Sequence, residues 1–505
     1  MCGFFITNDP NVTDIHEDLI EESLRFRGPD CSSGLLDIGR GWKAYHSRLS
    51  IIDIESGVNQ PVINEQGTLV FNGEILNFRE LGFKYFDKRY DSDTLLLNDL
   101  IIHGLLKLSE LDGFFSFVFV DRYGNVELAA RDRFGVKPLF YSKYESYISF
   151  SSEPALLNRI RPSKVDADAV DEYKCLRAPI FSDSYFKDVQ QVKPGNCLVR
   201  GEYFNCLNYV SKNYKNLNTS EVNLALMKGL ESRLISDAPV GLLLSRGVDS
   251  HILKSLNEFD RYYSIGFEGD EDIEFLKKKN YKNLNIVQSN YNQYRDDFDY
   301  LLKLRGEPMS VPNEVLLYRV ALHAAEDGIK VLLSGEGADE FFGGYDRIFQ
   351  WAAKTDKFEI DTFISLYCYS IPASNSVLYH QFVDVFNQLP ELSPFEIVRW
   401  FFIRYHMPVL FRRLDFSLMA AGVEGREPIA NMHTFVIAMA LGPEELMGAQ
   451  LGKIPLRNVV SSYMGSDFAY ESKVGFPVDL TKIFDNENNL TSYELWFEKN
   501  MEILK

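Results

Sequence analysis

Residues 239–250 read PVGLLLSRGVDS, and this stretch decides the fold of the second half of the chain. A short apolar run, 240–244, ends abruptly in small and polar residues, and an apolar pattern of helical spacing begins at Ile252. That order predicts a buried strand, a tight turn and a helix. Such a turn presents backbone N–H groups and a helix N-terminus to an anion, usually a nucleotide phosphate. Taken alone, the stretch fits an ordinary strand–helix turn equally well.

From residue 220 onwards, helical patterns alternate with short apolar runs, which predicts an α/β fold with a parallel sheet. The predicted elements lie at 222–234, 240–244, 252–256, 262–267, 273–279 and 331–333. Ligands bind such sheets at the carboxyl ends of the strands. Three ends carry suitable residues, at 245–250, 264–267 and 334–345. The third is rich in Gly and acid, and Asp249 and Asp339 are hard oxygen ligands suited to Mg²⁺ held against phosphates.

The first half of the chain is richer in predicted strands. Alternating patterns at 114–121 and 147–150 fit half-buried strands, and 192–199 followed by 203–209 predicts a last hairpin. Residues 213–219 are polar and without periodicity, which predicts a linker. Because 505 residues are too many for one core, we expect two domains, at 1–212 and 220–505.

Composition narrows the class of protein. Hydrophobic residues make up 46% and the formal net charge is -19, which disfavours a nucleic-acid partner, since phosphate binding needs a basic surface. No apolar run approaches the roughly 20 residues of a membrane span, and the N-terminus has no signal-like segment. The six scattered cysteines indicate free thiols in a reducing cytosol. We therefore expect a cytoplasmic protein without a membrane partner.

Cys2 is the cysteine with a second interpretation. If Met1 is removed, the N-terminal Cys combines a nucleophile with its own base, because the free α-amine can take the thiol proton. Asn72 and the Gly73 N–H could form an oxyanion hole, although Asn-Gly is also a common hairpin turn. Arg48 could bind a substrate carboxylate and Asp93 a substrate ammonium, which are two groups of glutamine; a turn or a surface pair is the alternative for each.

Together these clusters resemble a known family. Cys2-Gly3, Arg27-Gly28-Pro29-Asp30, Arg48-Leu49-Ser50, Asn72-Gly73-Glu74 and Ser92-Asp93 occur in the order and at the spacing of class II glutamine amidotransferases. The nearest resemblance is to the glutamine-hydrolysing asparagine synthetases, whose N-terminal domain is an α+β Ntn-hydrolase sandwich of antiparallel sheets between helices. The resemblance implies that Cys2 is the nucleophile and that Asn72 and Gly73 form the oxyanion hole. The residues it implies for glutamine binding are Arg48, Leu49, Ile52, Asn72, Gly73, Glu74 and Asp93.

The second half resembles the synthetase domain of the same family, which has an α/β PP-loop (adenine-nucleotide α-hydrolase) fold with extra helices. The family's Ser-Gly-Gly-x-Asp-Ser loop corresponds to 245–250, and its Ser-Gly-Glu-Gly-x-Asp-Glu segment to 334–340. The resemblance implies ATP and Mg²⁺ as cofactors, with Glu336 and Lys473 catalytic and with Asp249 and Asp339 on the metal. The implied ATP-binding residues are Leu243, Ser245, Arg246, Gly247, Asp249, Ser250, Ile265, Ser334 and Gly335. Two further segments, 413–420 and 423–428, match what is helical in the family.

The implied activity is amidation of a carboxylate through an acyl-adenylate, with ammonia from glutamine crossing a water-poor passage between two sites. Aspartate is the first candidate acceptor. Arg246 replaces a loop glycine and 426–431 departs from the family's Arg-x-Pro-Phe-Leu-Asp, so another carboxylate such as a sugar uronate stays open. So does a glutaminase or binding protein with an impaired synthetase site. At Arg246 we expect a negative φ and an added contact with phosphate or substrate. The resemblance also favours a homodimer.

Overall fold

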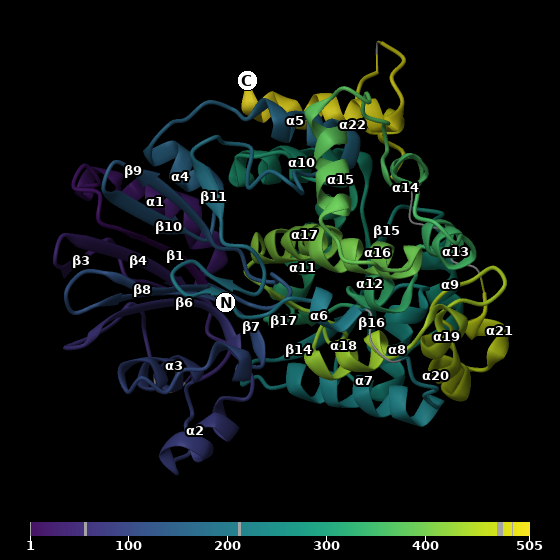
Figure 1. The fold of residues 1–505 in the computed structure, drawn as a ribbon, viewed down its shortest axis with the longest axis horizontal. Coiled ribbons are helices and arrows are strands. Elements are labelled where there is room, and N and C mark those ends of the chain that lie inside the picture. The colour runs from purple at the N-terminus through teal and green to yellow at the C-terminus, as the bar shows by residue number, and fades with distance from the viewer. Residues whose placement is uncertain (1, 55–57, 211–213, 472–477, 487) are drawn as a thin grey trace.

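The computed structural model describes residues 2–54, 58–210, 214–471, 478–486 and 488–505. Figure 1 shows the N-terminal strands stacked on the left and the teal to yellow, mostly helical remainder on the right. The first part contains two antiparallel sheets and the second a parallel sheet. In the part of the chain that is described, no helix is long and apolar enough to cross a membrane.

The first sheet is built around β1, and its strand order is β11-β9-β10-β1-β4-β2, with β3 pairing with β4. Its strands are β1 (Cys2–Thr7), β2 (Cys31–Ser32), β3 (Leu36–Gly39), β4 (Trp42–Arg48), β9 (Phe140–Tyr144), β10 (Tyr147–Ser151) and β11 (Val189–Gln191). Side chains alternate between the two faces of a strand, so Phe4 and Ile6 pack towards the second sheet and Phe5 packs under helices. The whole of β1 is buried as a result.

The second sheet runs in the order β13-β12-β8-β7-β6-β5. Its strands are β5 (Val62–Asn64), β6 (Gly67–Ile75), β7 (Gly113–Asp121), β8 (Val126–Arg131), β12 (Asn196–Cys197) and β13 (Gly201–Glu202). Val70 and Val118 pack against the first sheet, and Phe71 packs against helices on the opposite face. This arrangement places Asn72 on the sheet face directed at β1.

Helices cover the two outer faces of this sandwich. They are α1 (Glu17–Leu24) and α4 (Pro154–Ile160) on the first sheet, and α2 (Phe78–Phe86) and α3 (Asp93–Ile102) on the second. The expected pair of antiparallel sheets between helices is confirmed.

The third sheet is parallel, in the order β16-β15-β14-β17-β18. Its strands are β14 (Val240–Leu243), β15 (Tyr262–Gly266), β16 (Leu284–Gln288), β17 (Val331–Leu333) and β18 (Glu424–Arg426). Tyr263 and Leu332 pack on one face against α11 and α17, and Leu242 and Leu333 pack on the other against α8. The helices around it are α7 (Thr219–Arg233), α8 (Val248–Leu256), α9 (Glu271–Lys279), α10 (Tyr291–Arg305), α11 (Asn313–Glu326) and α17 (Met407–Met419).

Further helices complete the part of the chain that the structure describes. They are α5 (Ala167–Leu176), α6 (Leu207–Val210), α12 (Ala338–Phe342), α13 (Asp346–Lys354), α14 (Ile360–Tyr367), α15 (Val377–Asn387), α16 (Pro394–Phe401), α18 (Met432–Met439), α19 (Pro443–Leu446), α20 (Ile454–Met464), α21 (Ser466–Ala469) and α22 (Ser492–Met501). Single 3-10 turns lie at η1 (Asp14–His16), η2 (Arg25–Arg27), η3 (Leu108–Glu110), η5 (Leu480–Lys482) and η6 (Glu502–Leu504). A π-helical turn, η4 (Phe402–His406), joins α16 to α17.

Three local expectations need correction or comment. The predicted hairpin strand at 203–209 is wrong, because the short strand there is Gly201–Glu202 and the chain then turns into α6. The helical expectation at 423–428 is also wrong, because Glu424–Arg426 forms β18, which pairs with β17. Helix α7 already begins at Thr219, where Asn218 caps it, so helix replaces coil at the end of the predicted linker.

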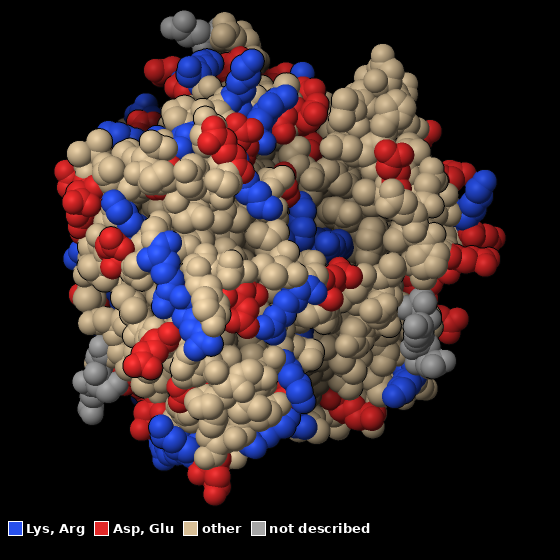
Figure 2. Space-filling view, turned by 60° about the vertical axis from the view of Figure 1, so that its left-hand side comes forward, with Lys and Arg blue, Asp and Glu red and all other residues tan. Residues whose placement is uncertain are grey.

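A cluster of buried charges joins the two parts of the chain. On the face shown in Figure 2, basic and acidic side chains are interspersed, but Arg27, Lys137 and Asp415 are almost wholly removed from solvent. Asp415 on α17 accepts from Arg27 Nη2 at 2.8 Å and from Lys137 Nζ at 3.1 Å. Burial opposes the ionisation of Asp415, but the charges of Arg27 and Lys137 outweigh it and lower its pKa. The two cations and the carboxylate therefore hold α17 against the sandwich.

Replacing Asp415 with Ala should lower the free energy of unfolding by about 3–5 kcal/mol, because Arg27 and Lys137 would be left buried without their shared carboxylate. Urea denaturation measures the loss. Arg200→Ala is the control: it breaks the Arg200–Glu127 pair, whose side chains are 46% and 44% exposed, and should cost less than about 1 kcal/mol. Equal losses in the two variants would contradict a structural role for the cluster.

Candidate active sites

Cys2 opens β1 and lies directly opposite Arg48 of β4 in the antiparallel pairing. The Cys2 backbone N donates to Asn72 Oδ1 at 3.1 Å. Asn72 Nδ2 is buried and has no hydrogen-bond partner among the described residues. Because an unmade buried hydrogen bond costs free energy, this amide donor is available to an oxygen atom that binds beside Cys2.

Asn72 and Gly73 lie inside β6, opposite Ser116 and Phe115 of β7, so they form no hairpin turn. Gly73 has a φ of 130°, and a Cβ there would lie 2.1 Å from the Phe114 carbonyl oxygen. Only glycine fits such a position. The constraint brings the Asn72 amide to the face that Cys2 occupies.

Burial raises the pKa of the Cys2 thiol, and the backbone N–H of Leu49 and the charge of Arg48 act in the opposite direction. The thiol is therefore protonated at neutral pH and needs a base to react. His46 lies on the neighbouring strand but is buried, with Nε2 against the Phe71 carbonyl, and burial lowers its pKa to about 3. His46 is therefore unsuited to act as the base, and the α-amine of Cys2 is the candidate for that role. Met1 lies outside the described residues.

Arg48 lines a cavity of about 250 Å³ that opens beside β4. Its Nη2 donates to the carbonyls of Ile52 at 3.2 Å and Asp53 at 2.9 Å, and Nη1 lies 3.5 Å from Asn59 Oδ1. The guanidinium therefore organises the loop that carries Ile52. Leu49 and Ile52 are themselves buried.

Asp93, at the start of α3, and Glu74, near the end of β6, form a buried acidic pair. Asp93 Oδ2 accepts from the Ile75 N–H at 3.0 Å and Oδ1 from the Thr94 N–H at 2.7 Å. Burial raises the pKa of Asp93 to about 6. Burial and then the charge of Asp93 raise the pKa of Glu74 well above its ordinary value. Such a pair is suited to a cationic group, which would restore ionisation.

The second site lies at the carboxyl ends of the parallel strands. A cavity of about 320 Å³ there is lined by residues from β14, β15, α8 and α11 and from the loop that follows β17. It brings together nine of the predicted residues: Leu243, Ser245, Asp249, Ser250, Ile265, Ser334, Gly335, Glu336 and Asp339. A Cβ on Gly335 would lie 2.7 Å from the Asp249 Cβ, so glycine allows the two loops to meet.

The loop between β14 and α8 is held by its own serines. Ser245 N donates to Ser250 Oγ and Gly247 N to Ser245 Oγ, both at 3.1 Å. Arg246 and Gly247 do not line the first cavity; they line an adjoining one of about 310 Å³, which shares Asp249 and Asp339 with it. The predicted loop therefore divides two connected cavities.

Arg246 has no positive φ, as expected. Its guanidinium makes an ion pair with Glu471, lies 3.8 Å from Glu271, and stacks over Phe275 at 5.3 Å from the ring centroid. The expected contact with phosphate or substrate would require Arg246 to leave these partners.

Lys453 is a residue of this site that the sequence reasoning missed. Its Nζ lies 2.8 Å from both Asp249 carboxylate oxygens and 2.5 Å from Asp339 Oδ1. It lies 204 positions from Asp249, and only the left-handed backbone of Lys453, with a φ of 58° before α20, marks it as unusual. Two carboxylates that converge on one cation fit Mg²⁺, which is commonly held by one or two carboxylates together with substrate phosphates.

Glu336 makes an ion pair with Arg413 of α17. Burial opposes the charge of Arg413, but Glu336 raises its pKa. The Arg413 guanidinium is thus held at the edge of the cavity of about 320 Å³, which Glu336 lines. The predicted Lys473 lies outside the described residues.

Comparison with known proteins matches both parts of the chain. A glutamine amidotransferase domain model matches residues 1–209, and an asparagine synthase model matches 221–495. The chain belongs to the asparagine synthase family.

Three relatives are similar to more than half of this chain. Asparagine synthetase [glutamine-hydrolyzing] 1 of Bacillus subtilis is 32% identical over 68% of this chain and 59% of its own length. A putative counterpart from Methanocaldococcus jannaschii is 33% identical over 60% of this chain and 58% of its own. Asparagine synthetase B of Escherichia coli is 25% identical over 94% and 82%. The chain thus spans less than two thirds of the first two relatives.

Glu427 is a further buried carboxyl. Glu427 is 2% exposed, and neither carboxyl oxygen has a hydrogen-bond partner among the described residues. Burial raises its pKa to about 8, against the opposing charge of Lys137. Glu336 of the second site and Asp132 of the first half also act on it, so this neutral carboxyl lies between the two parts.

Replacing Glu427 with Gln should remove a pH dependence of stability. The raised pKa means that the folded chain retains a proton that the unfolded chain loses between about pH 4.5 and 8. Stability therefore falls as pH rises through that window, by up to about 1.4 kcal/mol per pH unit. Urea unfolding at pH 5, 6, 7 and 8 should show the free energy of unfolding of Glu427→Gln rising with pH relative to that of the unaltered protein. The exposed Glu65→Gln is the control. A difference between Glu427→Gln and the unaltered protein that stays constant with pH would refute the neutral carboxyl.

Proposed function

We propose that the chain is a glutamine-dependent ligase that amidates a carboxylate, with aspartate as the acceptor and ATP cleaved to AMP and pyrophosphate. The observation that carries the proposal is the unpaired Asn72 Nδ2 beside Cys2, in a chain whose other half has an ATP-sized cavity at the carboxyl ends of a parallel sheet. A donor aimed beside a nucleophile is what hydrolysis of an amide requires.

In the first half, the Cys2 thiol attacks the side-chain amide of glutamine. The amide oxygen gains negative charge, which Asn72 Nδ2 and the Gly73 N–H stabilise, and a γ-glutamyl thioester forms as ammonia leaves. The α-amine, freed by removal of Met1, takes the thiol proton and passes it to the leaving ammonia, and water then hydrolyses the thioester to release glutamate. Arg48 binds the glutamine carboxylate after its loop adjusts, and the Glu74–Asp93 pair binds the ammonium.

In the second half, the serine-held loop acts as a PP-loop. Leu243, Ile265, Ser334 and Gly335 contact adenosine, and the phosphates extend into the adjoining cavity, where Lys453 and Arg457 lie with Arg246. Asp249 and Asp339 would hold Mg²⁺, which would neutralise charge on the phosphates. Lys453 then moves from the two carboxylates onto phosphate oxygens.

The acceptor carboxylate attacks the α-phosphorus and displaces pyrophosphate, giving an acyl-adenylate; ammonia then displaces AMP. Adenylation is needed because a carboxylate is a poor electrophile at neutral pH. A further cavity of about 310 Å³ is lined by Arg177, Asn313, Arg413 and Tyr493. It shares Asn313 with the ATP cavity. We assign the acceptor to it, with Arg413 and Glu336 at the reacting end and Lys473 stabilising the transferred phosphoryl group.

This two-site reading assigns residues 1–212 to a glutaminase domain, 213–219 to the linker and 220–505 to the synthetase domain. It places both in a cytoplasmic enzyme, with a homodimer as the assembly. Ammonia crosses between the sites through a water-poor passage, because protonation would remove its lone pair.

Purified protein given glutamine and Mg·ATP should release glutamate and AMP only in step with amidation of added aspartate. Cys2→Ala should abolish glutamine use and spare synthesis from ammonium chloride, because the thiol serves only the first site. Chromatography of amino acids and nucleotides measures both. Glutamate release without AMP would refute the ligase, and AMP formed with uronic acids but not with aspartate would replace the acceptor.

Lys453→Met should lower AMP formation about 100-fold, which is the loss typical of removing one charge-stabilising donor. Glutamine hydrolysis at Cys2 should be unchanged in the same preparation, which shows that the variant folds. Lys277→Met removes an exposed lysine of α9 that pairs with Glu274 and should leave both activities intact. A parallel fall in both activities of Lys453→Met would argue for a purely structural lysine.

A further inference from the structure

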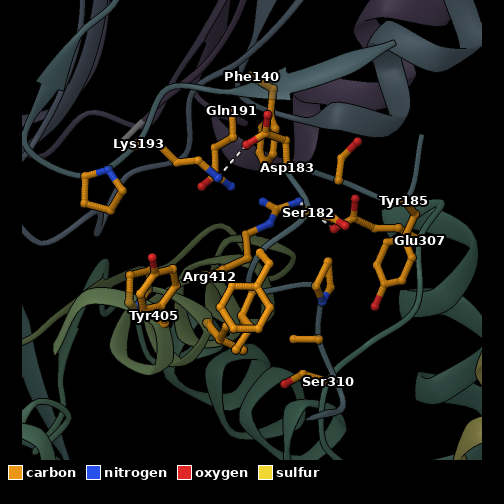
Figure 3. A pocket seen from close by; sticks show the side chains of 18 of the residues that line it. Phe140, Ser182, Asp183, Tyr185, Gln191, Lys193, Glu307, Ser310, Tyr405 and Arg412 are labelled. Atoms are coloured by element: carbon orange, nitrogen blue, oxygen red, sulfur yellow. Dashed lines mark hydrogen bonds and ion pairs between the residues drawn. The ribbon is translucent and has the colours of Figure 1, made fainter. Parts of the chain in front are cut away.

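One more cavity lies outside the ATP cavity and the cavity beside Arg48. Its volume is about 340 Å³, and it forms where the loop after α5 meets α15, η4 and α17 (Figure 3). None of its lining residues lines the ATP cavity or the cavity beside Arg48. It shares Arg177 with the cavity assigned to the acceptor, and the proposed reaction gives its other lining residues no role.

The chemistry of the lining is cationic and aromatic. Six basic side chains line the cavity against three acidic ones, in a chain whose net charge is -19. The basic residues are Arg131, Arg177, Lys193, Arg305, Arg404 and Arg412. Phe140, Tyr185 and Tyr405 supply aromatic walls, as Figure 3 shows. A cavity of this kind suits a small anion with an apolar body.

Hydrogen bonds and a helical turn fix the walls of the cavity. The loop that forms one wall is fixed by buried Glu172, whose carboxylate accepts from the backbone N–H groups of Ile180 at 2.6 Å, Phe181 at 2.8 Å and Ser182 at 2.9 Å. The opposite wall is the π-helical turn η4, which supplies Arg404 and Tyr405. Such turns are rare and are frequent at functional sites.

Two side chains of the lining, Arg404 and Gln381, have polar atoms without a hydrogen-bond partner among the described residues. Arg404 donates from Nη1 to the Pro194 carbonyl at 3.1 Å, and the remainder of its guanidinium has no recorded partner among the described residues. Gln381 Oε1 is buried there without a partner. A planar guanidinium binds a carboxylate through two parallel hydrogen bonds, so a carboxylate fits the remaining donors of Arg404.

The cavity is connected to Cys2 through three side chains. Arg412, near the centre of Figure 3, donates from Nη2 to Glu153 Oε2 at 2.6 Å and lies 3.5 Å from Glu307. Glu153 Oε1 accepts from Arg27 Nη1 at 2.7 Å, and Arg27 Nε donates to the Cys2 carbonyl at 3.1 Å. An anion that draws Arg412 away leaves Glu153 to Arg27, and Arg27 then holds the Cys2 carbonyl less firmly.

We propose that this cavity is a regulatory site for a small organic carboxylate, bound by Arg404 and Arg412, and that its occupancy is transmitted through Glu153 and Arg27 to Cys2. The transmission to catalysis rests on the proposed function; the binding does not.

Benzoate is the probe, with benzamide as its uncharged isostere and inorganic phosphate as an anion without an apolar body. Calorimetric titration should show benzoate binding, with at least about tenfold weaker affinity in Arg404→Gln, which loses a charge-assisted hydrogen bond. The exposed Arg122→Gln should bind as the unaltered protein does. Equal binding of benzamide, binding of phosphate alone, or full affinity in Arg404→Gln would overturn the carboxylate site.

The transmission is tested on the thiol itself, so its outcome does not depend on glutaminase activity. Saturating benzoate should speed alkylation of Cys2 by iodoacetamide, followed by mass spectrometry of the N-terminal peptide, by about fivefold or more. The acceleration should vanish in Arg404→Gln and persist in Arg122→Gln. Benzoate binding with an unchanged alkylation rate would overturn the transmission, whatever the chain does with glutamine.

Discussion

The buried ion pairs around Arg27 are the constraint on which the rest of the structure depends. Arg27 contacts the Cys2 carbonyl, Glu153 and Asp415 at once, with its side chain fully removed from solvent. Buried charges are tolerated only where every partner is satisfied. The sandwich and α17 therefore fit together in one relative position, because any shift would strand a charge. This requirement fixes the distance between the thiol and the second site.

The same cluster separates two kinds of carboxyl. Asp415 is ionised because Arg27 and Lys137 both reach it. Glu427 lies near the same lysine but has no hydrogen-bond partner among the described residues, and burial raises its pKa. The number of cations thus decides which acid carries charge. A neutral interior between the two sites is compatible with the proposed transfer of ammonia, since an ionised carboxylate would hold ammonium.

Much of this architecture follows from patterns in the sequence. The pattern at 114–121 predicts β7 and the apolar run at 240–244 predicts β14, because strands rich in apolar residues leave a local signature. The expectation that 114–121 is half-buried is wrong, because residues 114–120 are buried on both faces of the sheet. Strand β18 leaves none. Glu424 and Arg426 are buried and polar, and they form a strand only because β17 pairs with them. Helix α6 was mistaken for a strand for a similar reason, since its four residues show no period.

The site residues also divide into those with a local signal in the sequence and those without one. Asn72-Gly73 could be a turn or an oxyanion hole until β7 is placed beside it, when the Phe114 carbonyl excludes any side chain at Gly73. Lys453 could not be found locally, because its partner Asp249 lies 204 positions away and the pairing exists only after the sheet assembles. The Lys453 ammonium lies between the two facing carboxylates, and although burial opposes its charge, Asp249 and Asp339 raise its pKa. A phosphate-bound cation would have to replace this lysine, so nucleotide binding and lysine release become one event.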